Sequence, residues 1–247
     1  RRRPMSVRVE PVESRRVIRR DRVRVHLRCA GLNFKENIID RYNPDIYIHT
    51  FTTEGYWVPT EGKMGIFEHS PPIDEAAVRA AYNPISMAIE DYNDLEPTFA
   101  ERAKNFPVYY HRPRNIISMF YKMGAGVQMM ERHMMKTGKK YDLVIRMRPD
   151  MLLHQPMPEF DPGKLYTLAH RNHMGGGTGD MFQIGNPMAV MLFSKIGMIL
   201  EPLYDQTKLL CPHMLSVQHI RNLGIPWEEF HVHKTIQHTP NGQYKEA

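Results

Sequence analysis

The chain has 247 residues, of which 42% are hydrophobic and 24% charged, a balance typical of a globular protein that can bury a full core. No run approaches the roughly 18 apolar residues of a membrane span, and the arginine-rich start lacks the apolar block of a secretory signal. Cys29 and Cys211 are the only cysteines, so a disulfide framework is excluded and a reducing, cytoplasmic compartment is expected.

The net charge of +6 is concentrated at the amino end of the chain. Residues 1–28 hold eleven Arg against three acidic residues, a net charge of +8, so the remainder carries about −2. We therefore predict a basic arm over residues 1–20 and one domain over residues 21–247. Such an arm can bind nucleic acid or an anionic membrane surface, and a solvated leader is the alternative interpretation.

The predicted elements alternate between strands and helices. Alternating apolar residues at 22–29 predict a half-buried strand, which a Gly turn, a short helix and a second strand follow. This strand–helix–strand unit is the expected opening of a parallel α/β sheet. Prolines divide residues 52–114, where we predict short helices at about 74–81 and 84–92 and a short strand at 106–111.

The clearest predicted helix is capped by Asn115 and ends at Thr137 and Gly138. Its apolar residues recur every three or four positions and include a methionine stripe with an expected core role: Ile116, Phe120, Met123, Val127, Met130 and Met134. Gly124 and Gly126 inside it each cost about 1 kcal/mol relative to Ala, so tertiary packing must support this helix.

The carboxyl half continues the alternation. Its predicted elements are strands at 141–147, 164–169, 181–185 and 228–236, and helices at about 186–200 and 212–223. Asn186 is expected to cap the first of these helices, with Pro187 at its first position. The predicted fold class is a single α/β domain with a mostly parallel central sheet and helices on both faces.

Two guanidiniums and a carboxylate lie at the end of the predicted strand in the stretch YDLVIRMRPDMLL. Arg146, Arg148 and Asp150 share one face of the strand, although Pro149 is expected to bend the last step. Open α/β sheets bind ligands beyond the carboxyl ends of their strands. Arg suits bidentate contacts with diphosphate oxygens, and a carboxylate beside it is a natural ligand for Mg²⁺ or Mn²⁺. A structural ion pair is the alternative, which the spacing alone does not exclude.

This stretch, with the helix NIISMFYKMGAG before it, resembles the central block of glycosyltransferases of large algal viruses (chloroviruses) and bacterial surface-polysaccharide loci. Three further blocks follow the family's order: GLNFKENIIDRYNPDIYIHTF, GDMFQIGNPMAVMLFSKI and HMLSVQHIRNLGIPW. The resemblance implies a GT-A fold, which is a Rossmann-like sheet that binds a nucleotide sugar, usually with a divalent metal. It gives Asp150 the place of the family's metal-binding carboxylate. Arg148 stands where a full Asp-x-Asp motif has its first acid, so it can neutralise part of the diphosphate itself.

The resemblance also implies contacts elsewhere in the chain. Gly31 and Asn33, in the loop after the first strand, are expected to contact the nucleotide, although relatives often carry Arg where Asn33 stands. Ser118 and Tyr121 resemble donor-facing helix positions, and a half-buried structural role is the alternative for Tyr121.

Histidines are a second group that the resemblance singles out. His231 or His233 is implied as a C-terminal metal ligand. None of the thirteen histidines matches a zinc-binding spacing, so the others, including His213 and His219 on a predicted helix, are expected to be structural or surface residues.

The segment HMGGGTGD at 173–180 is unusually rich in glycine. It lacks the Gly-Lys-Ser/Thr of a P-loop, so a nucleoside triphosphatase is not expected. The glycines suggest backbone close to a ligand, or a loop that closes over one. Asp180 is the candidate general base of an inverting enzyme or a sugar-hydroxyl ligand in a retaining one, and a loop-capping role is the alternative. His170, Arg171 and His173 are candidates for acceptor or phosphate contacts.

The predicted function is transfer of a hexose or pentose from a nucleoside-diphosphate sugar to a hydroxyl of a glycan or glycoprotein acceptor. The expected donor is a UDP-sugar, with UDP-xylose as the specific guess, and the expected cofactor is Mn²⁺ or Mg²⁺. Two other function classes stay open. One is a nucleic-acid-binding protein that uses the Arg-rich arm, which the slightly acidic body disfavours; the other is an inactive sugar-nucleotide-binding scaffold.

Overall fold

The computed structural model describes most of the chain. It covers residues 23–26, 35–52, 55–58, 63–66, 73–107, 113–148, 151–153, 157–169, 177–231, 234–237 and 244–246. The predicted arm therefore lies outside the described residues, as do most of the strand predicted at 106–111 and the segment 170–176. Among the predicted site residues, Gly31, Asn33, Asp150 and His233 also lie outside them.

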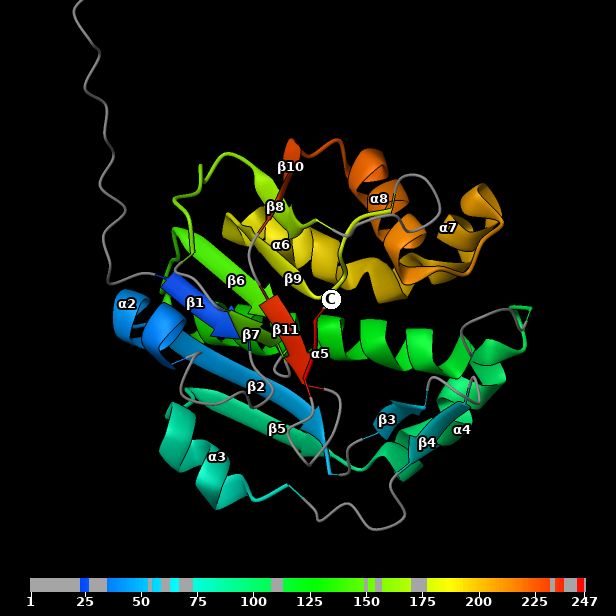
Figure 1. Cartoon of the computed structure of the whole chain (residues 1–247), viewed down its shortest axis with the longest axis horizontal. Coiled ribbons are helices and arrows are strands. Elements are labelled where there is room, and N and C mark those ends of the chain that lie inside the picture. The colour runs from blue at the N-terminus through cyan, green and yellow to red at the C-terminus, as the bar shows by residue number, and fades with distance from the viewer. Residues whose placement is uncertain are drawn as a thin grey trace, which may run out of the picture.

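A seven-stranded sheet forms the centre of the fold, in the order β5-β2-β1-β6-β9-β8-β10 (Figure 1). Its strands are β1 (Val23–His26), β2 (Asp45–Phe51), β5 (Ser86–Glu90), β6 (Leu143–Met147), β8 (Leu165–Leu168), β9 (Phe182–Gly185) and β10 (Trp227–Phe230). Neighbouring strands are parallel except where β9 runs antiparallel to both β6 and β8. The main sheet is therefore mixed.

Two small antiparallel sheets accompany it among the described residues. One is the pair β3 (Gly55–Val58) and β4 (Lys63–Ile66), and the other holds β7 (Met151–Leu153), β11 (Lys234–Gln237) and β12 (Tyr244–Glu246). The predicted α/β class is thus confirmed, whereas the prediction of a single, mostly parallel sheet is correct only in part.

Helices cover both faces of the main sheet, as predicted. One core packs against η2 (Lys35–Ile39), α2 (Asp40–Tyr42) and α3 (Glu75–Tyr82). The other packs against α4 (Tyr92–Ala103), α5 (Pro113–Thr137), α6 (Pro187–Ser194), η3 (Lys195–Ile199), α7 (Leu200–Thr207) and α8 (Pro212–Leu223). Ile145 and Val144 show the division, because these neighbours on β6 point into opposite cores.

Side-chain burial and the helix caps agree with the predicted helix patterns. Met123 and Met130 of α5 are 3% and 0% exposed, which confirms the core role of the methionine stripe. The Asn186 side chain accepts a hydrogen bond from the amide of Ala189 at 2.8 Å and so caps α6 as predicted. Gly224 ends α8 in a left-handed conformation with φ of 62°.

Several predicted boundaries were wrong. Residues 86–90 form β5 instead of the helix predicted at 84–92, because parallel pairing with β2 outweighs the helix propensity of methionine, alanine and glutamate. Helix α4 was not predicted, since Pro97 stands inside it. The helix capped at Asn115 instead begins at Pro113. The strand predicted at 228–236 is divided into β10 and β11.

The apolar stretch Pro187–Thr207 spans α6, η3 and α7. By length and composition it is the one helical stretch among the described residues that could cross a membrane, and 44% of its most apolar window is buried in the fold. Core helices of folded domains pass the same test, so the stretch is weak evidence for a membrane span.

The order of strands creates a switch point between β1 and β6. From β1 the chain proceeds to β2 and β5 on one side, whereas β6 lies on the other side of β1. Open α/β sheets bind ligands at the carboxyl ends of strands where the order reverses in this way. The register places His26 opposite Arg146 at this point, so the predicted arginine pair lies where a ligand is expected.

Candidate functional site

Three polar side chains stand in register across β6, β9 and β8. The ladder pairs Arg146 with Gln183, and Gln183 with Thr167. All three residues are buried, with exposed fractions of 7%, 0% and 0%. They share the face that carries Val144 and Leu165, so a polar row interrupts an apolar core and must find its hydrogen-bond partners inside the fold.

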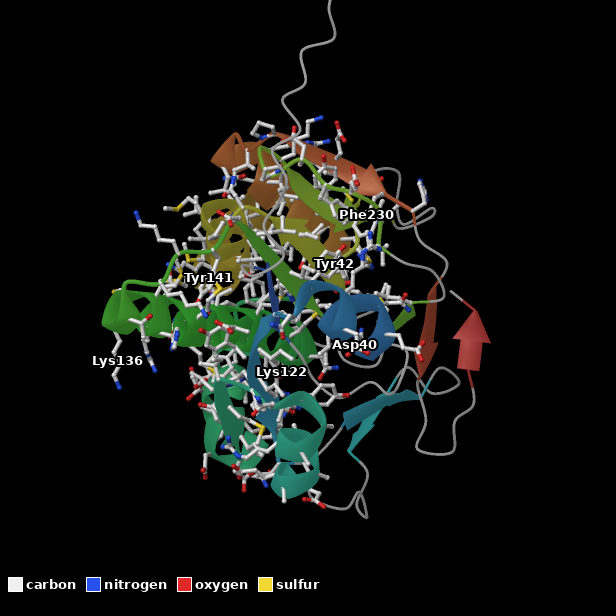
Figure 2. All side chains as sticks on the ribbon, turned by 90° about the vertical axis from the view of Figure 1, so that its left-hand side faces the viewer. Asp40, Tyr42, Lys122, Lys136, Tyr141 and Phe230 are labelled. Carbon is white, nitrogen blue, oxygen red and sulfur yellow. The ribbon has the colours of Figure 1, made fainter. Side chains whose placement is uncertain are left out.

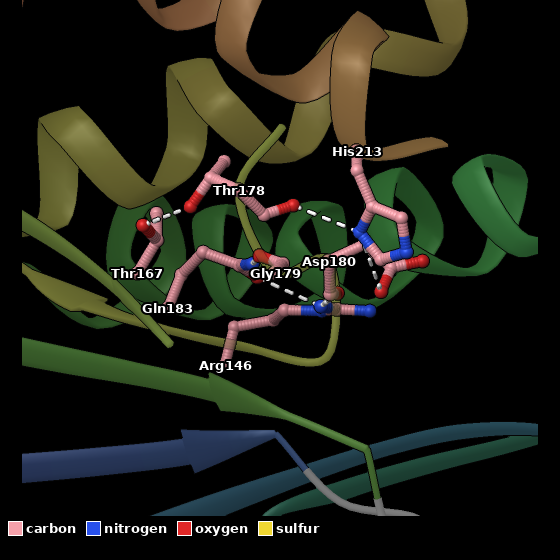
Figure 3. A network of polar contacts seen from close by, with 7 residues as sticks. All are labelled: Arg146, Thr167, Thr178, Gly179, Asp180, Gln183 and His213. Carbon is pink, nitrogen blue, oxygen red and sulfur yellow. Dashed lines mark hydrogen bonds and ion pairs between the residues drawn. The ribbon is translucent and has the colours of Figure 1, made fainter. Parts of the chain in front are cut away.

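The side chains of Arg146 and Gln183 are hydrogen-bonded to each other and to the end of the glycine-rich loop (Figure 3). Nη1 of Arg146 donates to Oε1 of Gln183 at 2.7 Å and to the main-chain oxygen of Asp180. Nε2 of Gln183 donates to the main-chain oxygen of Gly179 at 3.0 Å. Two carbonyl groups of the loop are thus fixed by side chains from the middle of the sheet.

A buried guanidinium lies near the carboxyl end of β6. Burial lowers the pKa of Arg146 to about 10, against the opposing effect of Asp180 and with a smaller contribution from Arg148. Arg146 is therefore still protonated at neutral pH. Half-buried Arg148 follows two residues later, and two cations so close together favour an anionic ligand.

Asp180 lies beside His213, which is the second residue of α8 (Figure 3). Nδ1 of His213 is 2.9 Å from the main-chain oxygen of Thr178 and 3.8 Å from Oδ1 of Asp180. Since a carbonyl only accepts, Nδ1 carries a proton. The side chains of Asp180 and His213 are 9% and 12% exposed, so both are largely withdrawn from water.

His213 was not predicted as a site residue. Pro212 marks a helix start in the sequence, which places His213 in a first helical turn. Nothing in the sequence, however, pairs this residue with position 178 or 180, which lies more than thirty residues away.

Two glycines of the loop are required by close approaches inside the protein. A Cβ on Gly177 would lie 2.6 Å from Cβ of His213, and a Cβ on Gly179 would lie 3.2 Å from the carbonyl carbon of Leu168 and nearer still to its oxygen. The amide of Gly179 donates to that oxygen at 3.0 Å. At these two positions the loop backbone therefore lies close to other groups of the protein, whereas the sequence suggested closeness to a ligand.

The two predicted donor-facing residues on α5 lie in different surroundings. Ser118 is 7% exposed and is one of the buried residues of α5. Tyr121 is half-buried, and its hydroxyl donates to the Glu90 carboxylate at 2.9 and 3.0 Å. Glu90 ends β5, so Tyr121 reaches the carboxyl edge of the sheet through this contact.

The described residues show no gathering of three or more His, Cys, Asp or Glu side chains that could hold a metal. His231 is described; it is exposed and directly follows β10, three strands from β6. Strand β11 pairs with β7, with Ile236 opposite Met151, so the C-terminal segment returns beside the residue that follows Asp150 in sequence. His238 follows the end of β11 that lies opposite the start of β7, whereas His233 precedes the other end.

Comparisons with known proteins add a distant structural likeness. No protein-family model matches the chain, and no curated protein matches it. The chain is similar to the apo crystal structure of mouse xyloside xylosyltransferase 1, with a TM-score of 0.42 and 11% identity over 85% of this chain and 84% of that chain. By its name that protein is a glycosyltransferase.

Proposed function

We propose that this chain is a glycosyltransferase of the GT-A type that binds a nucleoside-diphosphate sugar at the carboxyl ends of β1 and β6. The observation that carries the proposal is the position of Arg146 and Arg148 at the switch point of the sheet, with Asp180 held beside them. Two cations at this edge suit a diphosphate, and a carboxylate at its side suits the activation of a hydroxyl.

The two arginines have different tasks in this proposal. Nη1 of Arg146 is committed to Gln183 and to the Asp180 carbonyl, so Arg146 acts through its charge and by holding the loop. Arg148 is less buried and is the guanidinium that contacts the diphosphate. Fixed positive charge stabilises the negative charge that develops on the leaving diphosphate as the glycosidic bond breaks.

Asp180 is the proposed base of an inverting transfer. Its carboxylate takes the proton of the acceptor hydroxyl while that oxygen bonds to the anomeric carbon, and the bond from this carbon to the diphosphate breaks with its electron pair. His213 lies beside the carboxylate, and its place in the first turn of α8 brings the positive end of a helix near that carboxylate.

The remaining donor contacts are proposed for residues outside the described ranges. Gly31 and Asn33 follow β1 in sequence, and Asp150 precedes β7, so both segments adjoin the switch point along the chain. Asp150 is the proposed carboxylate ligand of a divalent metal. The strand order does not favour the histidines expected beside it, because His231 follows β10, three strands from β6, and His233 precedes the end of β11 that pairs with Leu153. When bound, Mn²⁺ or Mg²⁺ would supply further neutralisation of the diphosphate. The proposed donor is a UDP-sugar, UDP-xylose first, and the acceptor is a glycan hydroxyl.

Release of nucleoside diphosphate from a panel of UDP-, GDP- and ADP-sugars, with mixed oligosaccharide acceptors and with or without Mn²⁺, tests this function. We expect wild type to consume one nucleotide class, and Asp180→Asn to be slower by about 100-fold or more. Asp205→Asn is the matched control, because the Asp205 side chain is 71% exposed on α7 and pairs with Lys208. A panel that wild type leaves intact would contradict the proposal, and equal rates for wild type and Asp180→Asn would remove Asp180 from it.

A further inference from the structure

A second polar cluster lies at the carboxyl ends of β2 and β5. Glu90, the last residue of β5, stands opposite Phe51, the last residue of β2. Its carboxylate receives the Tyr121 hydroxyl at 2.9 and 3.0 Å, and Nε2 of His49 lies 2.8 Å from Oε2. Glu90 is thus held from the protein side by groups of β2 and α5.

The cluster is buried on one side and open on the other. The His49 side chain is 4% exposed, whereas the Glu90 side chain is 36% exposed. A carboxylate has about four acceptor sites, so the contacts with Tyr121 and His49 leave acceptor capacity toward solvent. Burial and the Glu90 hydrogen bond and charge raise the pKa of Tyr121 to about 12, so this hydroxyl remains a donor at neutral pH.

The surroundings fix the carboxylate in place. Tyr121 packs edge-on against Phe99 and His49, with ring centroids 5.4 and 5.8 Å away. The amide of Thr52 donates to the main-chain oxygen of Glu90 at 2.9 Å. Lys122 (labelled in Figure 2) covers the Phe51 ring, with Nζ 4.9 Å from its centroid. A fixed, half-exposed acceptor is the kind of group that recognises a ligand, whereas an apolar contact would suffice to dock α5 on the sheet.

The sheet sets the distance between this cluster and the arginine pair. Strands β5, β2, β1 and β6 are adjacent and parallel, so their carboxyl ends form one edge. At about 4.8 Å per strand, β5 and β6 are about 14 Å apart, a span that an extended nucleoside diphosphate can cover.

The position of Asp180 fixes the direction in which the donor lies. Asp180 precedes β9, on the side of β6 away from β1, so the transferred sugar must lie on that side. With the diphosphate at β1 and β6, the nucleoside then extends over β2 and β5 toward Glu90.

We infer that Glu90 binds the ribose of the donor nucleotide, with its carboxylate accepting hydrogen bonds from the 2′ and 3′ hydroxyls. Tyr121 and His49 are positioning residues that hold the carboxylate. This inference rests on the proposed function, because it needs a nucleotide at this edge of the sheet. It assigns a ligand contact to a residue that sequence patterns did not indicate.

Calorimetric titration of the full chain with UDP, GDP and ADP, with and without Mn²⁺, and then with the 2′-deoxy form of the nucleotide that binds, tests the inference. We expect wild type to bind the ribonucleotide at least tenfold more tightly than its 2′-deoxy form, as for loss of a hydrogen bond to a charged group. In Glu90→Gln this preference should fall to about threefold or less. Glu75→Gln, which alters an exposed ion-paired carboxylate on α3, should keep the wild-type preference.

The outcomes separate the two proposals. If wild type binds a nucleoside diphosphate without preferring the ribose form, or if Glu90→Gln keeps the preference, the ribose contact is wrong while nucleotide binding stands. If wild type binds none of these nucleotides, the proposed function falls, and this inference falls with it. The wild-type comparison still tests whether a ribose contact exists if Glu90→Gln does not fold. In that case Tyr121→Phe, which frees the carboxylate from one donor, should lower the preference.

Discussion

Arg146 and Gln183 stand opposite each other on antiparallel strands and join their side chains at 2.7 Å. Arg146 also donates to the Asp180 carbonyl, and Gln183 donates to the Gly179 carbonyl. These two contacts hold the backbone that carries the proposed base, Asp180. A buried charge is therefore used to set the geometry of a loop. The stability of the fold and the position of the base are coupled at this one contact.

Replacing Arg146 by Lys should destabilise the fold by about 1–3 kcal/mol, since the shorter lysine side chain does not bring its ammonium to the position of Nη1 and leaves a buried acceptor unsatisfied. Urea unfolding measures the change. Arg79→Lys is the matched control, because its ion pair with Glu75 is half exposed, and it should stay within about 0.5 kcal/mol of wild type. Equal stability of the two variants would mean that the Arg146 contacts are not formed in solution.

The loop glycine Gly179 should not tolerate a methyl group. Gly179→Ala forces a Cβ against the Leu168 carbonyl, which we expect to cost about 1–3 kcal/mol and to reduce transfer by displacing Asp180. Gly124→Ala in α5 is the opposite case, since the nearest atom to its Cβ is 3.6 Å away. That change should stabilise the protein by about 0.5–1 kcal/mol. Thermal unfolding of both variants checks the contrast, and a neutral Gly179→Ala would contradict the close approach.

Much of the fold could be predicted from local patterns. The methionine stripe of α5, the Asn186 cap and the Gly224 stop each depend on neighbours within about one or two helical turns, which the sequence displays. The β5 strand could not be predicted, because its five residues become a strand only through pairing with β2. The site likewise has residues that could be predicted from the sequence and contacts that could not.

The arginine pair and Asp180 were visible in the sequence as charged residues at strand ends. The residues that contact them could not be identified from the sequence. His213 reaches Asp180 from α8, and Glu90 meets Tyr121 across 31 positions. Such contacts depend on how α5 and α8 pack on the sheet, and no periodicity in the sequence encodes that packing.

His213 should act through Asp180. His213→Ala is expected to slow transfer by roughly tenfold with nucleotide affinity unchanged, because the carboxylate loses its neighbour while the donor site remains. In the Asp180→Asn background the same change should have no further effect on rate. Steady-state kinetics of the two single variants and the double variant measure this. An additive double variant would show that His213 acts independently of Asp180.

Tyr121 should ionise later than an ordinary tyrosine, since burial and Glu90 raise its pKa to about 12. The protonated form is the favoured one in the fold, so the stabilisation is complete below pH 10, the ordinary value, and is lost as pH rises through about 12. The difference in tyrosinate absorbance between wild type and Tyr121→Phe should show one step near pH 12. A step near pH 10 would mean that the Glu90 contact is absent in solution.

The proposed function requires that a nucleotide sugar binds at the carboxyl ends of β1 and β6. Thermal shift of wild type and Asp150→Ala against UDP-, GDP- and CMP-sugars, with and without Mn²⁺, tests it most directly. A ligand at about 100 times its dissociation constant adds roughly 2.7 kcal/mol of stability, which such a shift detects. We predict that one nucleotide class stabilises wild type in the presence of metal and that Asp150→Ala loses this gain. If no nucleotide sugar shifts the unfolding temperature of wild type under any condition, a nucleotide-sugar site at this edge of the sheet is excluded.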